Sequence, residues 1–568
     1  MPIFLIFAAF GVWSVVRSVR RRRESGPPPE RGPVGWTTGT RWRTLVPLAR
    51  AENRRLVRHP VFITGIALTP LMLWAATIVD HTSGEHWRGL STDVALALVP
   101  LGWFTIVASN LVAVRPNRTG TVELFAALPA PQPVRTAGAL SAMATAVTAA
   151  VLFATGWVIL LGARGGVVGS PHWAEIGAGV LVVAGAVTVG VAVGRWLPFA
   201  AFGVVAVVAV SVIQARFFDD TTWPWNMPHS HPVRFLGFLA EPTAVGDPAL
   251  EIRPAWWHLV YLAALIALMC AVALARDGVQ RRLGAVIVAA IGVALGVGWV
   301  QTRPLSDDQV AAMVSYITQP TDHQTCEQRQ TVRYCAYPPS RHLMDVWEAR
   351  VTGVLALLPP SIAQRPVEVI QRIPTTIGNS GCGPQPFLAG LPAKVADQLS
   401  PHTIWPDDGN LHPDLGNGSF PCNDRPTNQL FTAVQAGAWV VGLPPAPHDD
   451  DQRCTADGQA RAVVALWLAA AATPDGAALL GDLSLEGASS SGALTFDEWD
   501  NPPMWGVIYA ASDASLAIAM LEPPARQIAG ALARDWPRWV NPATPSTDLA
   551  RHLGLAAPPT TTAAATCP

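Results

Sequence analysis

Long apolar runs occupy the first half of the chain. Each has roughly the length, about 17 to 25 residues, that crosses a hydrocarbon core as a helix. After residue 302 no stretch of that length stays apolar without charges, and Pro, Asp, Gly and Asn interrupt the pattern. The pattern therefore predicts a transmembrane domain at 61–301 and a globular domain at 302–568. The predicted spans lie near residues 61–79, 90–114, 137–162, 174–194, 197–214, 257–275 and 283–301.

An additional apolar run covers residues 1–16. It is short, and its charged residues follow the run instead of preceding it. Because a secretory signal has its positive segment first, we interpret 1–16 as a candidate amino-terminal span with its amino terminus outside, or as an extension at the start site. The fold expected is a polytopic α-helical membrane protein with about 7–8 spans.

Arginine placement predicts the orientation of these spans, because cationic loops stay on the cytoplasmic side. Residues 17–58 contain 12 Arg and 3 Glu, so we interpret 17–60 as a cytoplasmic Arg-rich segment. Alternation of the spans then makes the loops 115–136 and 276–282 cytoplasmic, and both carry arginines. The same alternation places the domain at 302–568 outside the membrane.

The ratio of basic to acidic residues changes at residue 302, where the predicted membrane domain ends. Residues 1–302 contain 24 basic and 14 acidic side chains, whereas residues 303–568 contain 15 basic and 26 acidic ones. In the whole chain 14% of the residues are charged, well below the share of about 25% in soluble domains. We therefore expect a multi-pass protein of the cell membrane whose two regions face different surroundings.

The chain has a single lysine, Lys394, and this limits its chemistry. A Walker A phosphate loop requires Gly-Lys-Ser/Thr, whereas Lys394 lies between Ala393 and Val395. The sequence motifs of zinc proteases, α/β-hydrolases and dinucleotide-binding folds are also missing. We therefore expect no enzyme activity, no catalytic or metal site and no cofactor in this chain, and no nucleic-acid partner.

Six of the seven cysteines follow residue 302, and an even number suits a disulfide framework in an oxidising compartment. Cys326 and Cys335 flank a polar segment that is typical of a hairpin, which predicts a bridge between them. The alternative is a set of free or metal-bound thiols in a cytoplasmic domain, but no CxxC pair supports zinc. The candidate disulfide cysteines are Cys326, Cys335, Cys382, Cys422, Cys454 and Cys567.

The domain at 302–568 has mixed periodicity. Its sequence predicts helices at 306–317, 342–358, 457–473 and 524–536, and strands at 331–337, 366–373 and around 436–442. We therefore expect a C-terminal extracytoplasmic α+β domain, large enough to bury its own core.

The cytoplasmic segment before the first predicted span has an amphipathic pattern. Leu45, Leu48, Leu56 and Val57 lie among arginines at 41–58. This pattern predicts an elbow helix whose apolar face lies on the inner leaflet. The alternative interpretation is a basic flank that only fixes the orientation of the span.

The second cytoplasmic segment begins at Arg115 and reads RPNRTGTVELFAALP to Pro129. Pro and Gly come first, a short helix with an early glutamate follows, and a proline ends it. We expect a compact cytoplasmic knob between two spans.

The order of Arg, Gly-Thr-x-Glu-Leu and Ala-Leu-Pro in this knob resembles the ABC transporter type-2 permeases, the membrane subunits of exporters, and the chain is most similar to their actinobacterial type. The resemblance covers residues 41–275. It implies six helices per half-transporter, a second permease half in a homo- or heterodimer, contact with membrane lipid, and a separate ABC ATPase subunit that binds ATP. The span at 283–301 and the outer domain are appended to that core.

In that family the segment after the second span contacts the ATPase subunit. The resemblance therefore assigns an ATPase-coupling role to Arg115, Arg118, Gly120, Glu123, Leu124, Leu128 and Pro129.

From the residues alone, three functions stay open. A permease subunit of an ATP-driven ABC exporter predicts an ATPase that co-purifies with the chain. A membrane-anchored receptor or cell-wall sensor predicts a ligand for the outer domain and no ATPase. A membrane-bound transferase predicts acidic or histidine residues that converge at one membrane interface.

Overall fold

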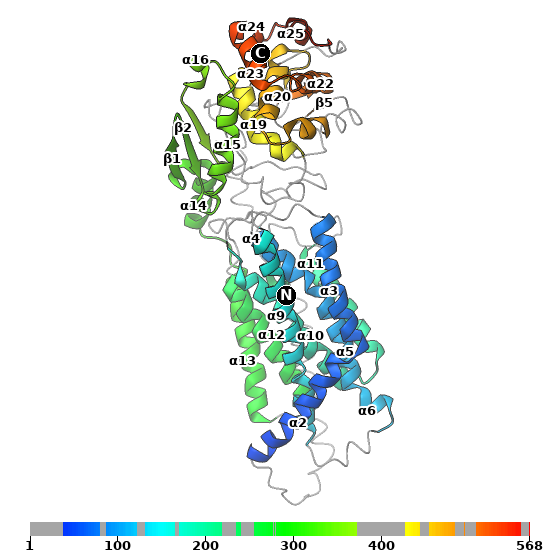
Figure 1. The fold of residues 1–568 in the computed structure, drawn as a ribbon. Helices are drawn as coiled ribbons and strands as arrows, with labels where there is room; N and C mark the ends of the chain where they lie inside the picture. The colour runs from blue at the N-terminus through cyan, green and yellow to red at the C-terminus, as the bar shows by residue number, and fades with distance from the viewer. Residues whose placement is uncertain are drawn as a thin grey trace, which may run out of the picture. The chain divides into compact units, whose positions relative to one another are not determined.

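The computed structural model divides the chain into two compact units; among the described residues, the first ends at Leu305 and the second begins at Ser306 (Figure 1). Each unit is described by itself. The structure describes residues 38–79, 87–121, 131–164, 170–218, 235–239, 255–276, 278, 280–371, 426–443, 454–482, 493–494, 507–557 and 567.

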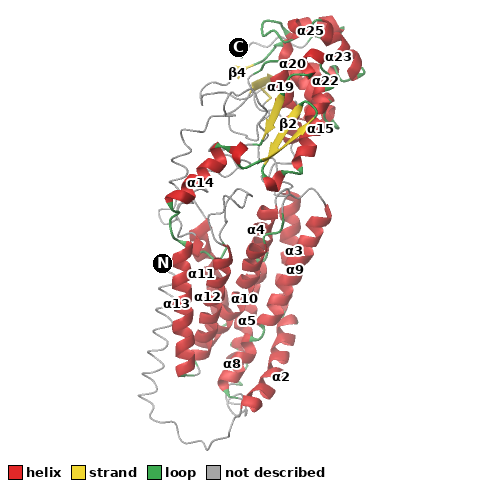
Figure 2. Ribbon diagram, turned by 90° about the vertical axis from the view of Figure 1, so that its left-hand side faces the viewer, coloured by secondary structure: helices red, strands yellow, loops and turns green. Residues whose placement is uncertain are grey.

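The regular structure described in the first unit is helical (Figure 2). Its helices are α2 Thr38–Val57, α3 Pro60–Val79, α4 Trp87–Ala97, α5 Val99–Ala113, α6 Arg115–Arg118, α8 Gln132–Leu140, α9 Met143–Arg164, α10 Trp173–Trp196, α11 Ala201–Phe218, α12 Ala255–Ala275 and α13 Arg281–Gln301.

Five helical stretches among the described residues are long and apolar enough to cross a membrane. They are Leu90–Ala113, Gln132–Ala163, Trp173–Trp196, Ala255–Ala275 and Arg281–Gln301. The chain is therefore a helical membrane protein, as its apolar runs predict. The predicted runs at 61–79 and 197–214 coincide with α3 and α11, whose apolar described parts are shorter.

Two of the crossing stretches are interrupted, where the apolar pattern predicts continuous helices. The break between α4 and α5 falls at Leu98, two residues before Pro100. Proline lacks an N–H donor and its ring disfavours a continuous helix at the preceding turn. The break between α8 and α9 falls at Ser141 and Ala142.

Helix α10 packs closely against α4 and α5 because glycines face those helices. A Cβ atom added at Gly179 would lie 2.7 Å from the Cα of Ala95, and one added at Gly190 would lie 2.4 Å from the carbonyl oxygen of Ile106. Small residues allow such approaches between membrane helices. By contrast, Leu152 on α9 is 68% exposed and Val288 on α13 is 70% exposed, as expected for faces that contact lipid.

The described residues of the second unit form one hydrophobic core and two small sheets. In the first sheet, β2 (Val332–Ala336) lies between β1 (Thr325–Arg329), which is antiparallel to it, and β3 (Val367–Ile370), which is parallel to it. In the second, β6 (Val507–Ala510) lies between β4 (Cys454–Thr455) and β5 (Ala493–Leu494).

The helices of this unit are α14 Asp307–Thr318, α15 Leu343–Leu355, α16 Pro360–Ala363, α19 Pro426–Val440, α20 Ala460–Ala471, α22 Ala511–Ala519, α23 Ala525–Arg534, α24 Trp536–Trp539 and α25 Ser546–Leu553. Helix α15 contacts β2, and helix α22 contacts β6. Residues Ala460–Ala470 of α20 are all buried, so this apolar helix is the centre of the core. The strand predicted around 436–442 is wrong, because α19 continues through Val440 and packs on α20.

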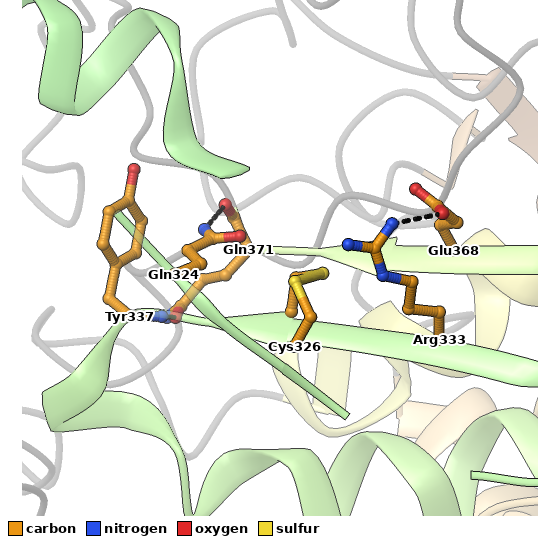
Figure 3. Close-up of a disulfide and its surroundings, with 7 residues drawn as sticks. Gln324, Cys326, Arg333, Tyr337, Glu368 and Gln371 are labelled. Carbon is orange, nitrogen blue, oxygen red and sulfur yellow. Dashed lines mark hydrogen bonds and ion pairs between the residues drawn. A yellow bond between two sulfur atoms is a disulfide. The ribbon is translucent and has the colours of Figure 1, made fainter. Parts of the chain in front are cut away.

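The predicted bridge between Cys326 and Cys335 is present (Figure 3). The two cysteines are directly opposite in the β1–β2 register, with Cα atoms 4.1 Å apart. Beyond the bridge, the side chain of Gln371 accepts a hydrogen bond from the backbone N–H of Tyr337 (3.0 Å). Cys567 is also disulfide-bonded, whereas Cys382, Cys422 and the side chain of Cys454 lie outside the described residues.

Candidate functional site

The arginine-bearing helix ends of the first unit meet at one end of its bundle. At the end of α10, a Cβ added at Gly194 would lie 2.8 Å from Ala113 at the end of α5. The indole N–H of Trp196 donates to the carbonyl oxygen of Val272 on α12 (3.0 Å). The guanidinium of Arg276 lies 5.5 Å from the centre of the Trp196 ring. Three helix ends that are distant in sequence therefore lie together.

The same end contains a polar pocket between the end of α2 and the short helix α6. Its volume is about 520 Å³. Arginines from both helices surround it, and the first residues of α3 and the last turn of α5 supply its apolar wall. The lining residues are Arg54, Arg55, Arg58, His59, Pro60, Leu111, Val112, Arg115, Arg118 and Thr119. We call this the arginine pocket.

Positive charge is poorly compensated in the arginine pocket. Arg55 forms an ion pair with Glu52 (2.5 Å). Within the described part of the chain, no ion pair joins a carboxylate to the other four arginines, Arg54, Arg58, Arg115 and Arg118. Because like charges repel at short range, this arrangement favours an anion between them.

His59 connects α2 to α3 at the wall of the arginine pocket. Burial, and secondly the charge of Arg118, hold the pKa of its imidazole below the ordinary value. Its Nδ1 is buried without a hydrogen-bond partner among the residues that the structure describes. A neutral His59 could become protonated if an anion entered the pocket.

Asn53 attaches α2 to the break between α8 and α9. Its side-chain amide donates to the carbonyl oxygens of Ala49 (2.8 Å) and Ser141 (3.2 Å). Its Oδ1 accepts from the backbone N–H of Thr145 (3.2 Å) and from the Thr145 hydroxyl. The elbow helix is therefore bound through both groups of one amide to the start of a long membrane helix.

Part of the apolar face of α2, which was predicted to lie on the inner leaflet, packs on protein instead. A Cβ added at Gly138 on α8 would lie 2.6 Å from Leu48, so these helices are in close contact. Leu56 is fully buried in the bundle core. The reason is that α8 runs along α2 and its glycine leaves room for the leucine, while Val57 stays half exposed.

The residues assigned to ATPase coupling divide between described and undescribed parts of the chain. Arg115 and Arg118 lie on α6, which directly follows α5. Gly120 follows with φ of +65°, a conformation that favours glycine. A helical turn forms at the Pro116 position, where a chain breaker was expected, because proline is tolerated in the first turn of a helix. Glu123, Leu124, Leu128 and Pro129 lie outside the described residues.

Sequence reasoning missed Asn53 and His59. Asn53 is a weak helix former inside an otherwise helical segment, which is a signal for a side chain with a specific partner. His59 sits between the last arginine of the elbow segment and the proline that starts α3. The signal at Asn53 does not identify the partner of its side chain, because Thr145 is 92 residues away in the sequence.

The second unit holds a buried carboxyl group, Asp513, near the start of α22. Its Oδ2 accepts a hydrogen bond from the backbone N–H of Gly458 (2.9 Å). Burial, with a smaller effect of Asp457, raises the pKa of Asp513 to about 7, although hydrogen bonds from Gly458 and Ser546 oppose the change. This group joins the loop before α20 to the starts of α22 and α25.

The comparisons with known proteins identify no relative with which these sites can be compared. No family model, no curated protein and no solved structure matches the chain.

Proposed function

We propose that this chain is the membrane permease subunit of an ATP-driven ABC exporter and that a separate ATPase subunit energises it. The observation that carries the proposal is the joining of two cytoplasmic elements to the bundle at one end. Asn53 attaches the elbow helix α2 to α9, and α6 continues from α5 through the single residue Val114.

The absence of a Walker lysine supports the assignment of ATP hydrolysis to a separate subunit. An ATP-driven transporter without a phosphate loop must receive work from another subunit, and force passes only through elements that are rigidly attached to the spans. Helices α2 and α6 have such attachments, and the knob that continues from α6 to Pro129 provides the docking segment. The resemblance to type-2 permeases assigns the ATPase contact to this same segment.

The proposed topology has seven spans within residues 60–301, counting α3 and α11. The clustering of arginines at one end supports placing that end in the cytoplasm. Helix α13 starts at Arg281 and has 21 residues, enough to cross the membrane. The residues after 302 then form an extracytoplasmic domain, and its disulfides suit an oxidising compartment.

The proposed assembly contains a second permease half and two ATPase subunits in the membrane of the cell. Pairing with a second half follows from the resemblance, since type-2 permeases supply six core helices per half. The exposed apolar faces of α9 and α13 remain available to lipid or to that second half.

The test is co-purification with an ABC ATPase, which the proposal expects to be encoded beside this gene. Glu123 is the one acidic side chain between Arg115 and Pro129, so it suits a basic partner. Glu123→Arg should reduce ATPase recovery and transport together, at least tenfold, because loss of a buried interfacial charge partner costs about 2 to 5 kcal/mol. Leu124→Asp should have the same effect, because it would bury an unpaired charge in the contact.

The matched control is Glu30→Arg, the same charge reversal in the other predicted cytoplasmic segment. It should retain the ATPase. Membrane insertion and the Cys326–Cys335 bridge should be unchanged in all variants. Recovery of the ATPase at the unmodified level by both knob variants would overturn the coupling role.

A further inference from the structure

We propose that the arginine pocket binds the phosphate group of an anionic phospholipid from the inner leaflet. The chemical class is a phosphodiester headgroup with its glycerol and first acyl carbons. The inference rests on the proposed function only for the cytoplasmic placement of this end of the bundle. It adds a ligand-binding site to a surface that was expected only to contact the ATPase subunit.

The charges of the pocket select an anion. Five arginines line it, and Glu52 is the carboxylate that neutralises one of them among the described residues. Guanidinium groups present several N–H donors in a planar fork that matches phosphate oxygens. Arginines from α2 and α6 approach the pocket from two sides, so one phosphate can bridge both helices.

The wall of the pocket favours a lipid over a free phosphate. Leu111 and Val112, in the last turns of α5, form an apolar surface beside the arginines. Pro60 starts α3 at the same place. A free ion would leave this apolar surface in water, whereas a lipid covers it with glycerol and acyl carbons. The cytoplasmic leaflet of membranes is rich in anionic lipids, which supply this ligand at high local concentration.

His59 lines the pocket, and its imidazole senses the charge there. Its Nδ1 is buried and has no hydrogen-bond partner within the described residues. The negative charge of a phosphate in the pocket would offset the charge of Arg118 beside the imidazole. The imidazole, whose pKa is depressed by burial and by Arg118, would then be protonated more readily.

Occupancy of the pocket would hold α2 and α6 together. One phosphate between Arg58 and Arg118 would replace the repulsion between the helices by attraction to a shared anion. The start of the knob at α6 would therefore be held at a fixed position relative to α2 in an anionic membrane. Lipid composition would set how well the coupling segment is positioned.

The first experiment measures lipid retention by the full chain. Protein purified in detergent is exposed to phosphatidylglycerol, to phosphatidylcholine or to inorganic phosphate, and bound molecules are counted by native mass spectrometry. We expect one retained phosphatidylglycerol per chain and at least tenfold weaker retention of phosphatidylcholine. Inorganic phosphate should displace the lipid only at concentrations at least a hundredfold higher than the lipid.

The variant Arg58→Gln/Arg118→Gln should reduce phosphatidylglycerol retention at least tenfold. Its matched control, Arg50→Gln/Arg282→Gln, removes two exposed arginines that do not line the pocket and should change retention less than twofold. Equal retention by both double variants would overturn the site. Displacement by inorganic phosphate at the concentration of the lipid would show a free-anion site and overturn the lipid assignment.

The second experiment needs no change in the arginines. In nanodiscs of the full chain with ¹³C-labelled histidine, the His59 signal is assigned by its loss in His59→Gln. Replacing phosphatidylcholine with phosphatidylglycerol should raise the titration midpoint of His59 by at least half a pH unit. An unchanged His59 midpoint would overturn the proposal.

The exporter assignment and the lipid site can be refuted independently of each other. Glu123→Arg should lose the ATPase and retain the lipid, because it leaves the arginine pocket intact. Loss of ATPase coupling in Glu123→Arg with normal lipid retention supports both proposals. Normal lipid retention in a chain that never binds an ATPase would overturn the exporter assignment and leave the lipid site standing.

Discussion

Asn53 on α2 and Thr145 on α9 are joined by two hydrogen bonds, although 92 residues separate them. The Oδ1 atom of Asn53 accepts both of them, and its amide nitrogen donates to Ser141 in the break between α8 and α9. One side chain therefore replaces helix hydrogen bonds that the break leaves unmade. The elbow helix consequently moves with α9.

Removal of the Thr145 hydroxyl should loosen this attachment. Thr145→Val keeps the shape of the side chain and deletes one donor, so the free energy of unfolding should fall by about 1 kcal/mol, and Asn53→Ala should cost about 1 to 3 kcal/mol. Hydrogen exchange of the α2 amides should become faster in both. The matched control is Thr148→Val, one turn further along α9, whose hydroxyl is exposed and bonds only to its own helix. Equal exchange in the three variants would contradict the attachment.

The contact of α10 with α5 should not tolerate a methyl group. In Gly190→Ala the new Cβ would lie 2.4 Å from the Ile106 carbonyl oxygen and 2.2 Å from the Ser109 hydroxyl, so the backbones must separate. We expect a loss of about 1 to 3 kcal/mol, measured as a lower melting temperature in detergent. Gly156→Ala on α9 meets no atom within 4 Å and should leave the melting temperature unchanged or higher. A Gly190→Ala protein as stable as Gly156→Ala would refute this packing.

The Cys326–Cys335 bridge provides a test of sidedness. On intact cells, a thiol reagent that cannot cross membranes should label the half-buried Cys326 only after reduction. The variant Cys326→Ser/Cys335→Ser should lose that part of the signal and about 2 to 3 kcal/mol of stability, since the bridge restricts the unfolded chain. Cys270 lies within α12 and serves as the unlabelled internal control. Labelling without reductant, or only after lysis, would contradict the bridge or the outside placement.

The stability of the second unit should depend on pH through Asp513. Its pKa of about 7 lies above the ordinary value of 3.8, so the folded state binds more protons than the unfolded state between these pH values. Stability should therefore fall as the pH rises from about 4 to 7, by about 1 to 3 kcal/mol, and stay low above 7.

Asp513→Asn should flatten this pH dependence. The measurement is hydrogen exchange of the α22 amides in the full chain, normalised to the intrinsic rate at each pH. Glu522→Gln, an exposed acidic position after α22, should keep the pH dependence of the unmodified protein. If Asp513→Asn and Glu522→Gln have the same profile, the buried carboxyl is not the group that titrates.

Local patterns in the sequence determined the membrane helices and the hairpin. An apolar run must form its hydrogen bonds within itself to enter a bilayer, so helix is the structure of each of the five crossing stretches. Cys326 and Cys335 are nine positions apart, and a hairpin of that size brings them together with no information from elsewhere in the chain. The clustering of arginines is likewise a property of single loops.

Tertiary structure alone decided the contacts between distant segments. Only the packing of α8 along α2 turned Leu48 toward Gly138 rather than toward lipid. The segment at 436–442 alternates like a strand, yet α19 remains helical there because its buried face packs on α20. The arginine pocket joins residues 54–60 to residues 111–119. Hydropathy reports what each residue prefers to contact, whereas shape complementarity and paired polar groups decide which partner it meets, and those depend on the whole fold.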